Sequence, residues 1–282
     1  MEILRSKSAL RAYIERNKEM GKHIGFAPTM GALHEGHMSL FKAAREENDL
    51  VVGSIFVNPT QFNNPKDLET YPRTVDVDLA LLERSGNVDA VYLPKVTDLY
   101  PDGLKSNSYD FDGLENKMEG EFRPGHFNGV GTVVELLFSQ VKPNRAYFGE
   151  KDYQQLAIIR KLVEKKNLPI QIKAVPILRE KSGLAMSSRN ERLSREDRNA
   201  AKLLNETLVK VDHWFRVVSI EEINERVEEI FKKAKGFDLE YFQIADEETL
   251  EPTDFFYKDR SYRAFIAVNL GNVRLIDNMH LA

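Results

Sequence analysis

Cysteine is absent from the 282 residues of this sequence. This absence excludes disulfide bonds, zinc–thiolate sites and a thiol nucleophile, because each of them requires a cysteine sulfur. The sequence also lacks any apolar run near the roughly 20 residues that a helix needs to cross a bilayer. Its first 20 residues are charged throughout and contain no apolar segment typical of a signal peptide. We therefore expect a cytoplasmic protein that has no membrane partner.

A large excess of charge of either sign is also missing. Lys and Arg total 40 and Asp and Glu total 44, which gives a formal net charge of -4. Such a balance gives no electrostatic reason to expect a nucleic-acid partner. Apolar residues make up 42% and charged residues 30%, as in ordinary globular proteins, and the length is sufficient for two domains.

Short apolar strands alternate with helices through the first 177 residues. The run LVVGSIFV at residues 50–57 is typical of a strand buried on both faces. Further strands are expected at residues 23–28, 89–93, 146–148 and 170–177, and helices at residues 4–16, 36–48, 75–84, 130–141 and 153–166. The alternation predicts a Rossmann-like α/β domain, with a doubly wound parallel sheet, over residues 1–177.

The pattern changes after residue 178. Two long charged helices are expected at residues 195–215 and 220–235, and three strands at residues 239–244, 264–269 and 273–277. Helices followed by strands predict a smaller α+β domain over residues 178–282. No repeat or low-complexity tract interrupts the chain.

The segment PTMGALHEGH at residues 28–37 lies between an expected strand and an expected helix. Gly31 and Gly36 allow the backbone to approach a ligand closely, and a helix N-terminus favours phosphate. His34 and His37 are three residues apart and can face the same side, where imidazole N–H groups could stabilise charge on an α-phosphate. Two surface histidines in a turn, or a metal site, are the alternatives, although two His alone are weak support for a metal. Neither G-x-G-x-x-G nor a P-loop motif occurs, so a nucleotide would have to bind another loop.

Two further segments also follow expected strands. In SIFVNPTQF at residues 54–62, Asn58 and Gln61 can each donate and accept hydrogen bonds, which suits a hydroxy acid at the carboxyl end of a sheet. In FGEKDYQQ at residues 148–155, Lys151 offers a cation for phosphate, Asp152 could cap the next helix, and Gln155 follows one turn later. An ordinary polar turn and a capped helix with a solvated lysine are the alternative interpretations.

Two loops complete the set of candidates. In LAMSSRN at residues 184–190, two hydroxyls and a guanidinium in succession could hold a polyanion. In EFRPGHF at residues 121–127, Arg123 and His126 flank a Pro-Gly turn and could contact a carboxylate or phosphate. For both segments a solvent-exposed loop is the alternative.

These blocks, together with YPRT at residues 71–74, resemble the signature blocks of bacterial pantothenate synthetases, in the same order, over residues 26–190. The resemblance implies membership in the nucleotidyltransferase superfamily that has the HIGH signature, with Glu35 at the second position of the motif. Met186 to Arg189 resemble the KMSKS loop of that superfamily, but its lysines are missing, so Lys151 and Arg189 would supply the positive charge.

The resemblance also assigns individual residues. It implies that His37 is a proton donor and that Gln61 contacts both pantoate and β-alanine. Gln155 is implied as a second pantoate contact, with Asn58 a third candidate. The catalytic residues are then expected to be His34, His37, Lys151, Ser187, Ser188 and Arg189. The implied ATP contacts are Met30, Gly31, Ala32, Leu33, His34, Glu35, Gly36, His37, Gly149, Glu150, Lys151, Asp152, Leu178, Met186, Ser187, Ser188 and Arg189.

The implied activity is the ATP-dependent condensation of (R)-pantoate with β-alanine, through an enzyme-bound pantoyl adenylate, to give pantothenate, AMP and pyrophosphate. Such a carbon–nitrogen ligase supplies a precursor of coenzyme A. We expect ATP with Mg²⁺ as substrate, no protein metal site, no tightly bound cofactor and a homodimer. Two other classes remain open. One is a HIGH-type nucleotidyltransferase that makes a dinucleotide, and the other is a non-catalytic nucleotide- or sugar-binding protein.

Overall fold

The computed structural model describes all residues from 1 to 282, and the chain folds into two compact units. The first unit comprises Met1–Glu150 and Gln154–Pro176, and the second comprises Lys151–Tyr153 and Ile177–Ala282. The sequence predicts the division between residues 177 and 178. The functions expected of the two domains stay predictions. None of the helices is long and apolar enough to traverse a lipid bilayer.

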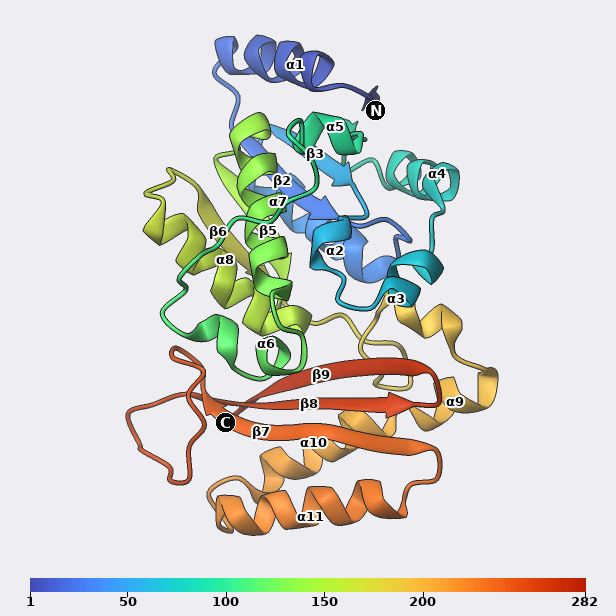
Figure 1. The fold of residues 1–282 in the computed structure, drawn as a ribbon, viewed down its shortest axis with the longest axis vertical. Coiled ribbons are helices and arrows are strands. Elements are labelled where there is room, and N and C mark those ends of the chain that lie inside the picture. The colour runs from blue at the N-terminus through green and yellow to red at the C-terminus, as the bar shows by residue number, and fades with distance from the viewer. The chain divides into compact units, whose positions relative to one another are not determined.

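The first unit is built on a six-stranded parallel sheet (Figure 1). Its strands, in the spatial order β1-β4-β3-β2-β5-β6, all run in the same direction. In chain order they are β1 (Glu2–Leu4), β2 (Ile24–Thr29), β3 (Leu50–Ile55), β4 (Ala90–Tyr92), β5 (Arg145–Gly149) and β6 (Gln171–Val175).

Helices cover both faces of this sheet. The helices along this part of the chain are α1 (Lys7–Glu19), α2 (Glu35–Glu47), α3 (Pro65–Thr70), α4 (Val75–Ser85), α5 (Val96–Leu99), α6 (Glu119–Phe122), α7 (His126–Val141) and α8 (Tyr153–Lys165), with 3-10 turns η1 (Pro59–Gln61), η2 (Leu114–Asn116) and η3 (Glu150–Asp152).

Side-chain alternation along the strands explains the two layers. On one face Ala27 and Tyr147 belong to a core cluster with Phe41 of α2 and Leu82 of α4. On the other face Phe138 of α7 lies against both Phe26 and Phe148, each with ring centroids 6.3 Å away. Because neighbouring strand residues point to opposite faces, both faces of the sheet are buried, and the predicted doubly wound fold is confirmed.

The second unit is a three-stranded antiparallel sheet that packs against helices (Figure 1). The strands are β7 (Phe237–Asp246), β8 (Tyr262–Leu270) and β9 (Val273–Leu281), and the helical elements are η4 (Ser188–Arg192), α9 (Arg195–Ala200), α10 (Leu203–Trp214) and α11 (Ile220–Lys233). Leu208 of α10, Val227 of α11 and Ile266 of β8 share its core. The predicted α+β character of this part is confirmed.

Several predicted bounds differ from the structure, and two of these differences have a local physical reason. The single helix expected at residues 195–215 is interrupted after Ala200, where Ala201 and Lys202 form a turn and Ala201 is fully buried. The helix expected from residue 4 begins only at Lys7, because Ser6 caps it by accepting a hydrogen bond from the Ala9 N–H (3.2 Å). The three residues Glu2–Leu4 form β1, which pairs with β4.

Candidate active site

The candidate residues of the first unit follow the carboxyl ends of β2, β3 and β5. The chain proceeds from β2 to β3 and β4 on one side and then returns to β5, which pairs with β2 on its other side. In open α/β sheets, ligands bind beyond the strand ends at such a reversal of strand order. Residues 30–37 follow β2, Asn58 and Gln61 follow β3, and Gly149 ends β5. The fold thus brings these predicted segments to one edge of the sheet.

The loop after β2 is held by a buried carboxylate that sequence reasoning missed. Asp78 of α4 is only 1% exposed and accepts hydrogen bonds from the N–H groups of Ala32 (3.0 Å) and Leu33 (2.8 Å). Thr74 donates to the same carboxylate through its hydroxyl (3.1 Å). Gly31 has a φ of +83°, a conformation that favours glycine, and a Cβ there would lie 3.1 Å from Asp78 Oδ2, so a larger residue would strain the backbone and press on the carboxylate.

His34 and His37 form a reciprocal cap at the start of α2. The Gly36 N–H donates to Nδ1 of His34 (3.1 Å), and the His34 N–H donates to Nδ1 of His37 (3.3 Å). A neutral imidazole that accepts at Nδ1 carries its proton on Nε2. The ring centroids are 4.1 Å apart. The helix N-terminus therefore holds two adjacent rings whose Nε2–H groups are suited to donate to an anion.

We expect Asp78→Asn to loosen this loop. An asparagine amide can accept only one of the two backbone N–H bonds and turns its NH₂ group toward the other. An unsatisfied buried donor of this kind costs about 1–3 kcal/mol of stability. Because the resemblance assigns this loop to ATP binding, we also expect kcat/KM for ATP to fall about tenfold or more, since small misplacements of binding groups lower rates strongly. Denaturant unfolding and steady-state kinetics measure both effects.

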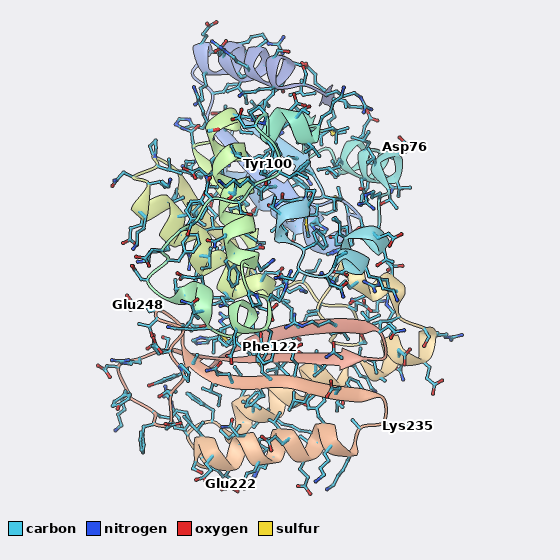
Figure 2. All side chains as sticks on the ribbon, in the orientation of Figure 1. Asp76, Tyr100, Phe122, Glu222, Lys235 and Glu248 are labelled. Carbon is cyan, nitrogen blue, oxygen red and sulfur yellow. The ribbon has the colours of Figure 1, made fainter.

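The neighbouring Asp76 provides the matched control for this prediction, because it lies on the same helix and is exposed (Figure 2). Asp76→Asn should leave both stability and ATP kinetics unchanged. Wild-type behaviour of Asp78→Asn would show that the carboxylate does not hold the loop.

The turn after β3 forms a closed hydrogen-bond network around Asn58. Its Nδ2 group donates to Gln61 Oε1 (3.1 Å) and to the Gly129 carbonyl (3.2 Å). Its Oδ1 accepts from the hydroxyls of Thr60 (3.1 Å) and Tyr100 (2.7 Å; Tyr100 is labelled in Figure 2). Asn58 is 1% exposed and has all four of its hydrogen-bonding positions filled. The side chain therefore orients Gln61, whose Oε1 is occupied and whose Nε2 remains suited to donate.

Tyr100 and Gly129 are further supports of this turn that the sequence did not indicate. Burial raises the pKa of Tyr100, which keeps the phenol protonated as a donor to Asn58. A Cβ at Gly129 of α7 would lie 2.4 Å from the Thr60 carbonyl oxygen, so only glycine lets the helix pack directly on the turn.

The segment around Arg123 and His126 also contacts Gln61. His126 is buried, and its Nδ1 lies 2.8 Å from the Gln61 carbonyl oxygen, to which Arg123 Nη2 also donates (3.4 Å). Arg123 forms an ion pair with Glu119 at 3.4 Å. Arg123 and His126 thus fix the backbone of Gln61, whereas Pro124 and Gly125 between them are exposed.

The two glutamines of the FGEKDYQQ segment have different surroundings. Gln154 is buried, accepts from the Glu119 N–H (3.0 Å) and donates to the carbonyls of Leu114 (2.9 Å) and Lys117 (2.7 Å). Gln155 is half-buried. Gln154 therefore stabilises the fold, and Gln155 is the glutamine suited to a substrate contact. Glu150 begins the η3 turn that follows β5.

The second unit contains the remaining predicted residues. Lys151 is mostly buried, with its Nζ 3.7 Å from Asp152, and its carbonyl accepts a hydrogen bond from Asn278 (2.9 Å). Residues 178–186 form a hairpin in which the Met186 N–H donates to the Leu178 carbonyl (3.0 Å). Ser187 then caps the η4 turn, because its Oγ accepts from the Arg189 N–H (3.2 Å). Ser188 is buried.

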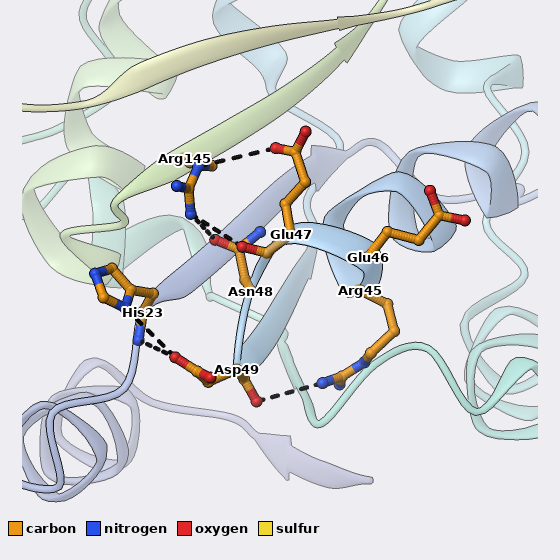
Figure 3. Close-up of a pocket in the computed structure, with 7 residues that line it drawn as sticks. All are labelled: His23, Arg45, Glu46, Glu47, Asn48, Asp49 and Arg145. Atoms are coloured by element: carbon orange, nitrogen blue, oxygen red, sulfur yellow. Dashed lines mark hydrogen bonds and ion pairs between the residues drawn. The ribbon is translucent and has the colours of Figure 1, made fainter.

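A hollow of about 340 Å³ in the first unit lies away from these residues (Figure 3). It is lined by His23, residues 45–49 and Arg145, which precede or begin β2, β3 and β5. In a parallel sheet this is the edge opposite to the carboxyl ends. His23 lies 3.4 Å from Asp49, and Arg145 donates to Asn48 (3.2 Å), so these two basic residues of the hollow already have partners. It is separate from the candidate active site.

The structure has no group of three or more His, Asp or Glu residues placed to hold a metal ion.

Comparison with known proteins identifies relatives over the full chain. The family model described as pantoate-beta-alanine ligase matches residues 2–280. The pantothenate synthetase of Christiangramia forsetii is 52% identical over 281 residues, which cover 100% of this chain and 99% of the relative. That of Aquifex aeolicus is 45% identical, with 95% of each chain covered.

Solved structures agree with these relatives. The crystal structure of pantothenate synthetase from Thermus thermophilus has a TM-score of 0.92 and 40% identity, covering 100% of this chain and 99% of that one. The pantoate-beta-alanine ligase of Francisella tularensis, in a complex with beta-gamma ATP and beta-alanine, has a TM-score of 0.82 and 38% identity, covering 99% and 97%.

Proposed function

Because this chain belongs to the pantoate–β-alanine ligase family, we propose that the residues at the ends of β2, β3 and β5 form pantoyl adenylate from ATP and pantoate. The chain is an ATP-dependent ligase that condenses (R)-pantoate with β-alanine and releases pantothenate, AMP and pyrophosphate. The assignment of the site rests mainly on His34 and His37, which cap the start of α2 where the strand order reverses.

In the first step a carboxylate oxygen of pantoate attacks the α-phosphorus of ATP. The bond from this phosphorus to the bridging oxygen breaks, and pyrophosphate leaves. Negative charge grows on the α-phosphate oxygens, and the Nε2–H groups of His34 and His37 donate to them. Lys151, Ser187, Ser188 and Arg189 stabilise the phosphates through charge and hydroxyl donors. No side chain becomes covalently attached, so catalysis consists of positioning and charge stabilisation.

In the second step the amine of β-alanine attacks the acyl carbon of the adenylate. The carbon–oxygen bond to the phosphate breaks, AMP leaves, and the attacking nitrogen loses a proton to become the amide. Gln61 contacts pantoate and β-alanine, with its Nε2–H as donor and with Asn58 holding its orientation. Asn58 thus acts through Gln61.

We expect Gln61 and Gln155 to determine which acid is accepted. A site that hydrogen-bonds a substrate hydroxyl leaves its own amide unpaired when the hydroxyl is missing, at a cost of about 1–3 kcal/mol. Gln61→Ala and Gln155→Ala should lower kcat/KM for pantoate more than for ATP. At least one of them should discriminate less against a pantoate analogue that lacks one hydroxyl.

The measurement is kcat/KM for both acids in the wild type and both variants, with Gln171→Ala, an exposed glutamine of β6, as control. An unchanged ratio between the two acids in both variants would show that these glutamines do not recognise the hydroxyls. Arg123, which contacts the Gln61 backbone, would then be the next residue to test.

Product identification tests the function itself. The protein is incubated with MgATP and pantoate, with and without β-alanine. We expect pyrophosphate exchange into ATP in the absence of β-alanine, and pantothenate, AMP and pyrophosphate in equal amounts in its presence. A nucleotidyltransferase that makes a dinucleotide would retain AMP within its product, and a binding protein would give no exchange.

Four further proposals concern the metal ion, the cofactor, the cellular compartment and the oligomeric state. We propose that Mg²⁺ arrives with ATP, that no cofactor is tightly bound, and that the enzyme works as a cytoplasmic homodimer. The lack of cysteine is consistent with a reducing compartment. Residues 1–177 are proposed to bind ATP and pantoate, and residues 178–282 to contribute the Met186–Arg189 loop. Sedimentation analysis tests the dimer.

A further inference from the structure

Asp277 and Asn278 are adjacent residues of β9. They connect the two segments of the second unit that are proposed to act on the phosphates. Both are almost fully buried, at 3% and 2% exposure. Because neighbouring strand residues point to opposite faces, their side chains reach different partners. We propose that this pair positions both Lys151 and the Met186–Arg189 loop for adenylate formation, an inference that rests on the function proposed above for those residues.

The first connection runs from Asp277 to the hairpin that precedes the loop. Arg179 donates to both carboxylate oxygens of Asp277, at 2.6 and 3.0 Å. The same guanidinium donates to the Gly183 carbonyl (3.1 Å) at the hairpin turn and to the Asn278 carbonyl (3.3 Å). A bidentate pair fixes direction as well as distance, so it sets where the hairpin leaves the sheet.

The hairpin connects Arg179 to the Met186–Arg189 loop over a few residues. Arg179 pairs with Ala185 in an antiparallel bridge, and the Met186 N–H donates to the Leu178 carbonyl (3.0 Å). Met186 is the first residue of the loop that carries Ser187, Ser188 and Arg189. The backbone of the loop is therefore connected to Asp277 through one arginine and one residue pair of the hairpin.

The second connection runs from Asn278 to Lys151. The Asn278 Nδ2 group donates to the Lys151 carbonyl (2.9 Å), and its Oδ1 accepts from Arg263 Nη1 (2.6 Å). Arg263 is itself held by Glu247 (2.7 Å) and lies over the Tyr153 ring, 4.0 Å from the centroid. This anchored amide restrains the backbone of Lys151 and so limits where its ammonium group can reach.

We therefore expect substitutions of Asp277 and Asn278 to slow adenylate formation, which releases pyrophosphate, much more than the reaction of the adenylate with β-alanine. Asp277→Asn keeps the shape and removes the charge that Arg179 requires. Asn278→Asp keeps the volume and the acceptor for Arg263, but it cannot donate to the Lys151 carbonyl. Both are positioning residues, because neither is proposed to touch the substrate.

The test compares pantoate-dependent pyrophosphate exchange with the conversion of preformed pantoyl adenylate and β-alanine into pantothenate. Each variant should lose about 10²-fold in the first assay, as expected for misplaced groups, and less than about threefold in the second. The second assay also reports correct folding. Glu240→Gln is the matched control, because Glu240 of β7 pairs with Arg274 of β9 (2.8 Å) but is connected to neither Lys151 nor the hairpin.

Equal losses in both assays, or no loss in Asn278→Asp, would overturn the inference. If Asp277→Asn does not fold, the Asn278→Asp result alone decides. Failure of the proposed function would be distinguishable, because the wild type and the Glu240→Gln control would then show no pantoate-dependent exchange.

Discussion

Replacing His37 with alanine is expected to lower kcat by ~10²–10³, the usual effect of removing one preorganised donor from a developing oxyanion. The affinity for ATP should change much less, because the donor matters most when charge has accumulated on the α-phosphate. The backbone N–H of His34 donates to His37 Nδ1, which leaves the Nε2–H as the donating group. Steady-state kinetics and direct ATP binding measure the two effects.

His37→Gln separates hydrogen-bond donation from proton transfer. A glutamine amide donates a hydrogen bond from a similar position but does not release a proton at neutral pH. Partial recovery of kcat over the alanine variant indicates donation, and no recovery indicates proton transfer. His23→Ala, at the opposite edge of the sheet, should be neutral. Near-wild-type kcat in His37→Ala would remove this residue from the reaction.

The second large effect is expected for Lys151→Ala. Loss of a cation directed at the phosphates should slow the reaction from ATP by about 10²-fold. The reaction that starts from preformed pantoyl adenylate should be far less impaired, because pyrophosphate has already left. Ser187→Ala, Ser188→Ala and Arg189→Ala should show the same division between the two assays.

Lys161→Ala is the control for this prediction. Lys161 is a partly buried lysine of α8 that is paired with Glu164 (2.8 Å) and Asp112 (3.2 Å), and it has no proposed role in the reaction. Equal losses of Lys151→Ala in both assays would contradict a role restricted to the phosphates.

Much of the fold was predictable because local patterns and tertiary structure agree. The run at residues 50–57 corresponds to β3, all of whose residues are buried, as a strand covered on both faces requires. The three residues of β1 are too few for any periodicity to be recognised. The interruption after Ala200 has no proline or glycine to indicate it, and Ala201 is buried in the packed core of the second unit.

The buried residues that hold the candidate active site in place were harder to predict than the residues proposed to contact substrate. Asp78 and Ala32 are 46 residues apart, and His126 and Gln61 are 65 apart, so no local spacing indicates either contact. One signal was present, because Asp78 lies on the same helical stripe as Val75 and Leu82. A carboxylate among apolar positions is buried only when it has partners, and here the partners are the backbone N–H groups of Ala32 and Leu33 in the loop after β2.

Transfer of oxygen-18 from pantoate to AMP shows whether an acyl adenylate is formed. Pantoate labelled in both carboxylate oxygens is converted with MgATP and β-alanine, and the products are analysed by mass spectrometry. If the carboxylate attacks the α-phosphorus, one labelled oxygen bridges to the phosphate and leaves with AMP, while the other stays in the amide of pantothenate. We expect AMP that carries one label and pyrophosphate that carries none. Unlabelled AMP, or label in pyrophosphate, would contradict adenylate formation.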